Sequence, residues 1–344
     1  MNAVRRVNVL FGLAMIGVVG CGDGGSSGDG TEKPTGSSTT PGSTTTGTGT
    51  SGPIAGAKYD SNGILQPPDA ATGLQIVTPT FTLNPGDEVF KCFHTTVPKN
   101  TEVDVHRFVS QMTPGSHHFI LYQESGTDAA AATNTLDDVG CTGGLTSQWV
   151  YASSSTDNSL PMPDGVAIPL GANQPVLFDM HYINTGTSPL SVHVSLNMEL
   201  AQGTFQKAGA LVSFNTSINV PPNGTQTVSG SCSAPAGAQF FVASTHTHKH
   251  ATLATVDKMV DGQITQELVH TTDWEHPDVA TFETPPYLTF GANEQIYYSC
   301  SYQNDTSTAI TVGVSAIKNE MCMAVMYFFP APNNTTPCGS FGAP

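Results

Sequence analysis

The sequence predicts an all-β protein in which two tandem jelly-roll-like antiparallel β-sandwich domains follow a disordered tether. Short runs of alternating apolar and polar residues recur along the chain, and clusters of Gly, Pro, Asn and Ser separate them, which is typical of half-buried strands. No long segment has the 3.6-residue period of an amphipathic helix. Residues 58–344, about 290 in number, exceed one typical core, so we expect two domains.

The N-terminus, residues 1–21, is predicted to be a lipoprotein signal peptide. Two arginines precede an apolar run to Val19, which is too short for a membrane-spanning helix and has the anatomy of an export signal. The run ends in VVGC, which resembles a bacterial lipobox with Val18 where leucine is usual. We therefore expect Cys21 to be lipidated, and the alternative is an ordinary signal peptide with a chance cysteine.

Residues 22–56 consist mainly of Gly, Ser, Thr and Pro, and they cannot bury enough apolar surface to offset the entropy of ordering. We expect a flexible tether of about 35 residues that spans roughly 30 Å on average. Behind a lipid anchor, such a tether holds a folded body off the membrane. The predicted location is therefore the bacterial cell envelope, on its periplasmic or its outward-facing side.

The charge of the chain argues against nucleic acid as a partner. The net charge is −16 and the chain has 11 Lys and Arg residues, whereas nucleic acid needs a dense cationic surface. An acidic surface repels further copies of itself, and we expect a monomer.

The first domain is expected over residues 57–202 and the second over residues 203–344, with the boundary near Gln202. Many short strands with regular turns predict sandwiches or jelly rolls. The predicted strands of the first domain are 88–97, 102–112, 117–123, 175–183 and 190–200. The predicted strands of the second domain are 208–220, 226–234, 239–248, 295–303, 309–317 and 323–329.

The cysteines predict disulfides. Of seven cysteines, removal of Cys21 for lipidation leaves six, and an even number in an exported protein favours disulfides over buried free thiols. One set per domain is the simplest arrangement. The first domain has Cys92 and Cys141, and the second has Cys232, Cys300, Cys322 and Cys338.

The segment FVASTHTHKHATL, residues 240–252, carries His246, His248 and His250 at alternate positions. Alternate residues of a strand point to one face, so two of these imidazoles would lie side by side at a separation suited to one metal ion. The spacing leaves two pairs open, His246 with His248 and His248 with His250. It also permits a solvent-facing row of Thr and His without metal.

Two further motifs carry histidine. His117 and His118 follow a Pro-Gly turn, and because adjacent strand residues point to opposite faces, both reach one metal only where the backbone bulges or is still turning. Without a bulge, one faces inward and the other outward. His181 lies among apolar strand residues, where a lone histidine is commonly a hydrogen-bonded core residue.

The stretch KNEMCMAVMYFFP places Met321, Met323 and Val325 on one strand face and Cys322 on the other. Thioether sulfur is a soft ligand that suits Cu(I), although methionines also fill cores. A thiolate beside copper would bind or oxidise, so Cys322 is better placed in a disulfide on the opposite face.

In this order along the chain, HH, HY, HTH and EMC resemble the copper type II, ascorbate-dependent monooxygenases, the family of dopamine β-monooxygenase and the peptidylglycine hydroxylating monooxygenase. The segment EHPDV at 275–279 and the cysteine of IYYSCSY are smaller similarities, and the resemblance covers residues 72–340. It implies two jelly-roll-like domains that each hold one copper.

The resemblance also implies roles for individual residues. Two coppers per chain would be held in separate pockets, and the second would be the catalytic copper, which selects His246 with His248 over the rival pair. The implied disulfides are Cys232–Cys338 and Cys300–Cys322, and Cys92 and Cys141 are paired because only they remain. The implied ligands are His117, His118 and His181 for the first copper and His246, His248 and Met321 for the second.

The implied activity is hydroxylation of a substrate carbon by O2, with ascorbate or another one-electron reductant and a small-molecule substrate. An all-histidine copper stabilises both oxidation states and suits electron storage. Two histidines and a methionine favour Cu(I), the state that meets O2.

The chain departs from the peptidylglycine enzyme at the substrate. That enzyme has an arginine two residues before the first histidine of HTH, which binds the peptide carboxylate, and this chain has Ser244 there. Its polar substrate-contacting positions beyond EMC are Met323 and Val325 here. Without a bidentate partner for a carboxylate, we expect glycine-extended peptides to be poor substrates.

Two other functions are compatible with these residues. A non-catalytic copper-binding lipoprotein of the cell envelope would keep the ligands without turnover. A structural tandem sandwich that binds a cell-surface partner would need no metal. The remaining histidines are expected to be structural or exposed, and they are His94, His106, His193, His270 and His276.

Overall fold

The computed structural model describes residues 53–126, 134–138 and 147–338. The named elements within these ranges are all β-strands and no α-helix occurs among them, so the predicted all-β class is confirmed. The described residues belong to one compact unit. Among them, no helix has the length and apolar character that crossing a bilayer requires. Cys21 and the expected tether through residue 52 lie outside the described residues.

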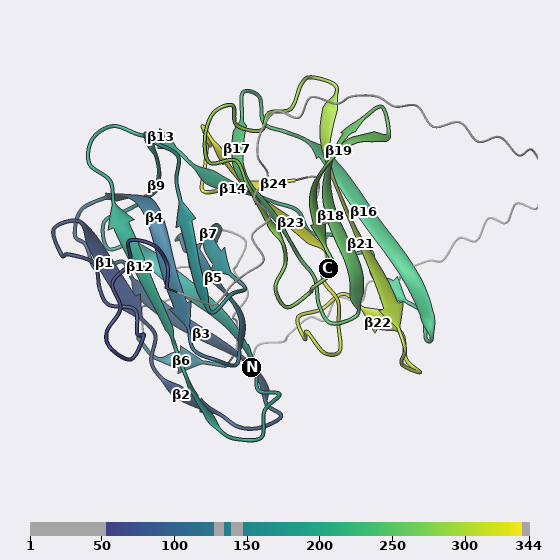
Figure 1. Ribbon diagram of the computed structural model, residues 1–344, viewed down its shortest axis with the longest axis horizontal. Coiled ribbons are helices and arrows are strands. Elements are labelled where there is room, and N and C mark those ends of the chain that lie inside the picture. The colour runs from purple at the N-terminus through teal and green to yellow at the C-terminus, as the bar shows by residue number, and fades with distance from the viewer. Residues whose placement is uncertain (1–52, 127–133, 139–146, 339–344) are drawn as a thin grey trace, which may run out of the picture. The chain divides into compact units, whose positions relative to one another are not determined.

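Two sheets and a short ribbon form the first half of the chain (Figure 1). The outer sheet has the order β1-β12-β4-β9-β13, with β8 paired to β4, and the sheet that carries the histidines, here called the histidine sheet, has the order β6-β3-β10-β5-β7. The outer strands are β1 (Gly73–Val77), β4 (Val103–Met112), β8 (Asp157–Pro161), β9 (Val166–Leu170), β12 (Val194–Leu200) and β13 (Gln206–Lys207). The histidine sheet has β3 (Glu88–Thr96), β5 (Ser116–Gln123), β6 (Leu136–Asp137), β7 (Gln148–Ser153) and β10 (Pro175–Ile183), and the ribbon has β2 (Phe81–Leu83) and β11 (Leu190–Val192).

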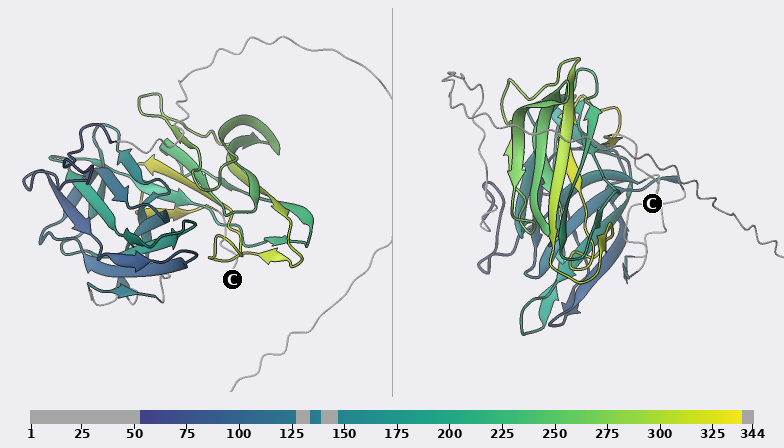
Figure 2. Two further views of the ribbon diagram at one scale, coloured as in Figure 1. Left: turned by 60° about the horizontal axis from the view of Figure 1, so that its bottom comes forward. Right: turned by 90° about the vertical axis from the view of Figure 1, so that its right-hand side faces the viewer.

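The second half has the same general plan (Figures 1 and 2). A middle sheet of order β20-β17-β23-β14-β24 lies nearer the first half, a far sheet of order β16-β21-β18-β19 lies beyond it, and β15 pairs with β22. The middle strands are β14 (Gly209–Val212), β17 (Gln239–His246), β20 (Val279–Thr281), β23 (Met323–Phe329) and β24 (Thr335–Pro337). The others are β15 (Asn219–Val220), β16 (Gly224–Ser233), β18 (Ala251–Val260), β19 (Gln263–Thr271), β21 (Glu294–Asn304) and β22 (Ile310–Thr311).

The middle sheet is buried on both faces. On β17, Phe241 joins the hydrophobic cluster of the first half, whereas its neighbour Phe240 joins the cluster of the second half. Tyr327 and Met326 on β23 divide in the same way, as the two-residue alternation of a strand requires. This explains why residues 323–329 read as a continuous apolar run instead of an alternating one.

The division into two domains near Gln202 stays a prediction. Strands before Gln202 pair with one another, and strands from β14 onward pair with one another. The parallel pair of β13 with β9 crosses the boundary. The first hydrophobic cluster nevertheless continues into β14, β17 and β23 of the second half. Trp149 on β7 also donates a hydrogen bond from Nε1 to Tyr327 Oη at 3.0 Å.

Three predicted strands are shorter than expected. The segment 208–220 forms only β14 and the two residues of β15. In the segment 309–317, only Ile310–Thr311 is a strand, because the chain then turns and its amides bond elsewhere. Strand β17 ends at His246, so the row of alternate histidines does not continue along one strand. In the second and third cases a carboxylate accepts backbone hydrogen bonds in place of a neighbouring strand: the half-buried Glu88 in the second and the fully buried Glu320 in the third.

The structure contains Cys232–Cys338 and Cys300–Cys322, the two disulfides that the resemblance implies. Their presence is consistent with an exported protein. Cys92 on β3 is fully buried and disulfide-bonded. Cys141 lies outside the described residues, so its pairing with Cys92 stays a prediction.

We expect the two described disulfides to differ in their contribution to stability. They close segments with sequence separations of 106 and 22 residues, and loop-closure entropy gives about 5 and about 3 kcal/mol respectively. Urea unfolding of the double serine variants at positions 232 and 338, and at 300 and 322, measures both. Equal losses, or a larger loss for the shorter segment, would contradict the entropic account.

Candidate metal centre

His117 and His118 stand at the start of β5, where the strand bulges. His118 lies opposite His181 of β10 and Ser116 lies opposite Tyr182, so His117 is an extra residue in the register. The sequence requires such a bulge if both imidazoles are to reach one ion, and the structure has it. The two ring centroids lie 4.9 Å apart.

The turn before the bulge depends on a glycine. Gly115 has a φ of 94°, in the region that L side chains rarely adopt, and a Cβ there would lie 2.7 Å from Leu190. The Pro-Gly pair before the histidines therefore sets the direction in which the chain enters β5.

His181 is fully buried at the centre of the histidine sheet, because β10 has β3 on one side and β5 on the other. Its ring stacks on Phe90 with centroids 4.1 Å apart and planes at 16°. Its Nε2 donates a hydrogen bond to Glu88 Oε1 at 3.0 Å. Its centroid lies 5.1 Å from that of His117 and 5.2 Å from that of His118.

His246 is the last residue of β17, and His248 follows in a turn that Glu320 holds in place. The fully buried Glu320 accepts hydrogen bonds from the backbone amides of His248 at 3.0 Å and His250 at 2.6 Å. Burial raises the pKa of Glu320 to about 7, although these amide donors act in the opposite direction. The His250 ring lies within hydrogen-bond distance of the carbonyl of Ile317, so it belongs to neither group of close histidines.

Five imidazoles form one cluster, here called the histidine cluster, which consists of His117, His118, His181, His246 and His248. The candidate ligand atoms of His117, His118 and His181 all lie within 4.8 Å of one another, and those of His117, His246 and His248 do so as well. The centroids of His118 and His246 are 4.8 Å apart. The resemblance implies two separate pockets, whereas the structure gives two adjoining groups with His117 common to both.

Unpaired nitrogens in this cluster have the chemistry of metal ligands. Among the described residues, four buried ring nitrogens have no hydrogen-bond partner: His117 Nε2, His118 Nδ1, His181 Nδ1 and His248 Nε2. Each such atom costs about 1–3 kcal/mol, and a native fold that keeps four together needs a reason. Coordination of a transition metal such as copper by neutral imidazoles would be such a reason. The residues present therefore fit the implied ion.

Two hydrogen bonds fix which nitrogen carries the free lone pair. The Nε2–H of His181 donates to Glu88, which leaves the lone pair on the unpaired Nδ1. The Nδ1–H of His248 donates to the carbonyl of Asn319 at 3.2 Å, which leaves the lone pair on the unpaired Nε2. These tautomers are assigned from the partners, and such partners orient metal-binding histidines.

Burial keeps the cluster uncharged in the metal-free protein. Desolvation, followed by repulsion from neighbouring imidazoles, lowers the pKa of His117 and His118 well below the usual value of 6.5. The same two causes lower the pKa of His181 and of His246 to about 3. Desolvation also lowers the pKa of His248 to about 3, although its hydrogen bond to Asn319 acts in the opposite direction.

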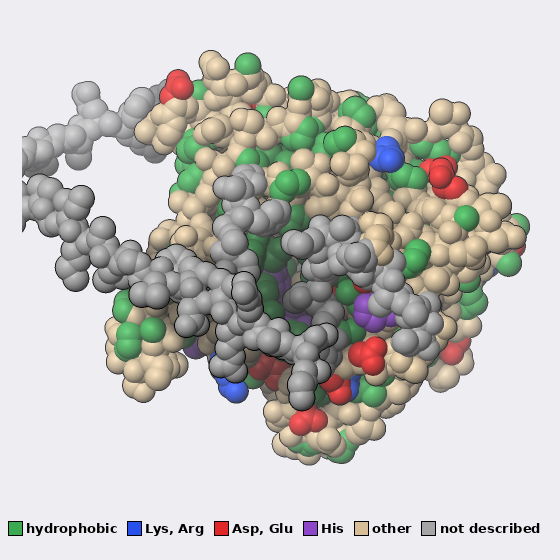
Figure 3. Space-filling view, turned by 180° about the vertical axis from the view of Figure 1, so that it is seen from behind, with side chains coloured by type: hydrophobic (Ala, Val, Ile, Leu, Met, Phe, Trp, Pro, Cys, Tyr) green, Lys and Arg blue, Asp and Glu red, His purple; other side chains and the backbone are tan. Residues whose placement is uncertain are grey.

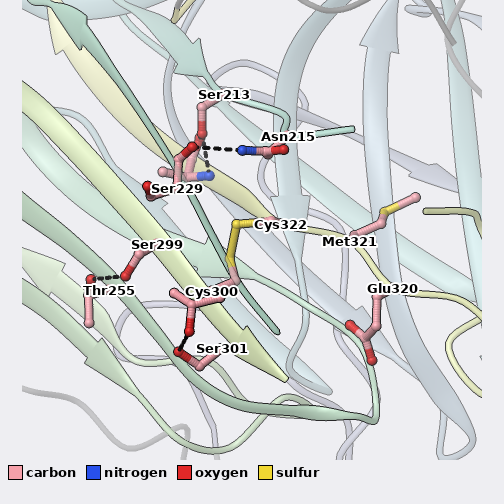
Figure 4. The surroundings of a disulfide bond; sticks show 12 residues. Ser213, Asn215, Ser229, Thr255, Ser299, Cys300, Ser301, Glu320, Met321 and Cys322 are labelled. Atoms are coloured by element: carbon pink, nitrogen blue, oxygen red, sulfur yellow. Dashed lines mark hydrogen bonds between the residues drawn. A yellow bond between two sulfur atoms is a disulfide. The ribbon is translucent and has the colours of Figure 1, made fainter. Parts of the chain in front are cut away.

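Met321 is held between two anchors, of which Figure 4 shows the disulfide. Its carbonyl accepts a hydrogen bond from Tyr302 Oη at 2.8 Å, and the next residue, Cys322, is bonded to Cys300 of β21. The side chains of Met321 and Cys322 point in opposite directions in Figure 4, although Met321 precedes β23. Its side chain lines the same cavity as His118 and His246.

This cavity has a volume of about 1150 Å³ and lies between the histidine sheet and the middle sheet. Its wall is mainly apolar, and Figure 3 shows hydrophobic and histidine side chains in the hollow on this face. Its charged lining residues are all acidic, with no Lys or Arg among the described lining. They are Asp138, Asp179 and Glu283.

Asp179 is the buried acid of this cavity. It is 7% exposed, lies two residues before His181 on the same face of β10, and makes no hydrogen bond or ion pair with any described residue. Burial raises its pKa to about 7. Such a group in an otherwise apolar wall is a candidate contact for a polar group of a ligand.

The site includes residues that sequence reasoning missed. Glu88 and Asn319 contact the cluster through registers and turns that no local pattern reveals. Trp274 lies against His117, with centroids 5.0 Å apart. The sequence signal that could have indicated Trp274 is the EHPDV segment, which begins at the next residue. The histidines expected to be structural lie outside the cluster, for example His94, which lies 3.1 Å from Glu124.

One comparison with known proteins concerns the second half of the chain. Residues 206–344 match the family model described as copper type II ascorbate-dependent monooxygenase, C-terminal domain. The match supports this family, and with it a copper-dependent oxidoreductase. The comparison with curated proteins returned no match.

Two solved structures of viral capsid proteins are distantly similar to the chain. The major capsid protein P2 from bacteriophage PM2 is 10% identical, with a TM-score of 0.32 over 74% of this chain and 97% of that chain. The STIV MCP is also 10% identical, with a TM-score of 0.30 over 74% of this chain and 95% of that chain. At these scores the likenesses carry no argument about function.

We expect Glu320→Ala to destabilise the protein by about 2–4 kcal/mol, because it leaves the buried amides of His248 and His250 without an acceptor. Chemical unfolding measures this loss. The matched control is Glu267→Ala, which removes an exposed carboxylate whose partner is His270 and should cost less than about 1 kcal/mol. Similar losses for both variants would contradict the role of Glu320.

We also expect the metal-free protein to lose stability as the pH falls from about 6.5 toward 3. The folded-state pKa values of His181, His246 and His248 lie near 3, so in this window the unfolded chain binds more protons and acid favours it. Each imidazole contributes up to about 1.4 kcal/mol per pH unit. Unfolding free energies measured across this range should fall less steeply in His246→Ala, and an unchanged slope would refute the assignment.

Proposed function

We propose that the protein is a copper-dependent monooxygenase that hydroxylates a substrate carbon with O2 and a one-electron reductant such as ascorbate. The observation that carries this proposal is the set of buried, unpaired imidazole nitrogens beside an apolar cavity. The match of residues 206–344 to the C-terminal domain of such enzymes supports it.

The proposed copper ligands are the three histidines of the first half and, in the second half, two histidines with a thioether. Bound copper would supply one-electron chemistry and a binding position for O2. Glu88 and the carbonyl of Asn319 would hold the imidazoles in the binding tautomer. The ligands are His117, His118 and His181 for one ion and His246, His248 and Met321 for the other, of which the second set would act in catalysis.

The cavity favours an uncharged or cationic substrate with an apolar body. Ser244, which stands where the peptidylglycine enzyme has its arginine, lines the cavity and donates its hydroxyl to the carbonyl of Asp278 at 3.0 Å. Asp179 in the wall would repel a carboxylate and attract an ammonium group. The apolar lining, which includes Met323 and Val325, matches an apolar body.

We further propose that the protein is exported and lipid-anchored through Cys21 in the bacterial cell envelope, where it works as a monomer. The disulfides Cys232–Cys338 and Cys300–Cys322 support an oxidising compartment. Detergent partitioning and mass analysis of the mature N-terminus, compared with Cys21→Ser, test the anchor. A soluble mature protein without lipid would refute it.

The test of the function is ascorbate-dependent O2 uptake by the protein loaded with two equivalents of copper, followed by product analysis over a panel of amines and amides. Hydroxylated product and its loss in His246→Ala are the expected results. Tight binding of two coppers without turnover of any substrate would favour a non-catalytic copper-binding lipoprotein. Failure to bind copper would favour a structural sandwich.

Among substrates of one apolar body, we expect an amine to exceed the matched carboxylate in kcat/KM by about tenfold or more, and glycine-extended peptides to react poorly, because Asp179 lies in the cavity wall. Asp179→Asn should reduce kcat/KM for the amine by about tenfold, the magnitude of one charged hydrogen bond, and leave a neutral alcohol unaffected. Steady-state kinetics on the three compounds measure this. Efficient peptide hydroxylation would refute the expectation.

A further inference from the structure

Glu88 lies at the first position of β3, at the edge of the histidine cluster. Its side chain is 15% exposed, and β3 pairs antiparallel with β10 so that Glu88 lies opposite Ile183 and Phe90 lies opposite His181. This register brings the carboxylate of Glu88 to the outer nitrogen of the His181 ring.

Both oxygens of Glu88 are engaged, and they reach both halves of the chain. Oε1 accepts from Nε2 of His181 at 3.0 Å and from the backbone amide of Ala316 at 2.8 Å. Oε2 accepts from Oγ of Ser315 at 2.8 Å. One carboxylate therefore joins a candidate ligand in the first half to a turn in the second half.

The turn that Glu88 binds leads to the other group of histidines. The amide of Asn319 donates to the carbonyl of Ser315 at 2.9 Å, and the carbonyl of Asn319 accepts from Nδ1 of His248 at 3.2 Å. Ala316 is fully buried, and its carbonyl accepts from the amide of Lys249, the residue after His248. A chain of hydrogen bonds thus runs from the ring of His181 through Glu88 and the turn to the ring of His248.

We propose that Glu88 is a positioning residue that couples the two histidine groups across the halves of the chain. It holds His181 in the tautomer whose Nδ1 lone pair is free, and it holds the Ser315–Ala316 turn that supports His248. A disturbance at His181 therefore reaches the turn through Glu88. The inference concerns contacts of the metal-free protein, and only its consequence for metal binding rests on the proposed function.

This coupling explains why segment 309–317 leaves the strand that its sequence predicts. The amide of Ala316 and the hydroxyl of Ser315 both point at a carboxylate, and hydrogen bonds to a charged acceptor are stronger than those of a sheet ladder. The alternating pattern of AITVGVSAI predicts a strand, but Ser315 and Ala316 bond to the carboxylate of Glu88 instead of to a neighbouring strand. Glu88 lies more than 220 positions earlier in the sequence.

The first test uses the metal-free protein, with amide exchange at Ala316 and the imidazole nitrogen resonances of His181 as readouts. Glu88→Gln keeps the shape of the side chain but removes its charge. We expect it to accelerate exchange at Ala316 by about tenfold or more and to shift the tautomer of His181. Ser315→Ala removes one of the contacts of Glu88 with the turn, so it should accelerate exchange at Ala316 and, because coupling is reciprocal, shift the His181 resonances less than Glu88→Gln does.

The matched control is Glu124→Gln, which alters a similar buried contact between a glutamate and a histidine, His94, elsewhere in the first half. It should change neither readout. If Glu124→Gln changes both as much as Glu88→Gln does, the effect is a general loss of stability and the proposal is wrong.

Coupling itself is tested by a double-mutant cycle. His181→Ala should accelerate exchange at Ala316 when Glu88 is present and should add little in the Glu88→Gln background. Equal effects of His181→Ala in both backgrounds, or no effect in either, would overturn the proposal.

Zn²⁺, which is redox-inert, separates this inference from the proposed function. We expect Zn²⁺ to slow exchange at Ala316 further in the wild type and much less in Glu88→Gln. If Zn²⁺ slows exchange equally in both, Glu88 does not couple the groups. If neither Zn²⁺ nor Cu²⁺ binds, the proposed function fails, while the metal-free cycle still decides the role of Glu88.

Discussion

The structure depends on a cluster of five neutral imidazoles, four of which bury a ring nitrogen that has no hydrogen-bond partner among the described residues. The histidine sheet and the middle sheet bury these nitrogens, and a metal ion could use their lone pairs. Desolvation that lowers the pKa of His181 to about 3 is also what leaves its lone pair available. The energetic cost and the capacity to bind metal therefore have one physical origin.

Residues outside the cluster hold its histidines in place. The carboxylate of Glu88 accepts a hydrogen bond from the ring of His181, and the carboxylate of Glu320 accepts one from the backbone amide of His248. The middle sheet supplies the opposite wall, and because it is buried on both faces it shares side chains with both hydrophobic clusters. Both halves contribute histidines to the cluster, so the site requires the two halves to lie together.

The charged residues that line the cavity are acidic, which would give the proposed site a selectivity among substrates. Asp179 has no hydrogen-bond or ion-pair partner among the described residues, and its carboxylate would disfavour anions and favour apolar or cationic molecules. Position 244 carries serine and not arginine, so this position also offers no positive charge to an anionic substrate. Selectivity in this chain would therefore come as much from what its wall repels as from what it holds.

The sequence by itself determined the all-β class and the residue types of the cluster, because alternation and motif spacing are local properties. The disulfides Cys232–Cys338 and Cys300–Cys322 were predicted from the family resemblance that those motifs carry. It also identified the condition for His117 and His118, a bulge, without being able to tell whether the bulge exists. Tertiary structure decided the bulge, the early end of β17, and the union of five imidazoles around His117. It also decided the contacts of Glu88, since contacts between residues more than 90 positions apart depend on strand register and on competition between acceptors, and no local pattern encodes either.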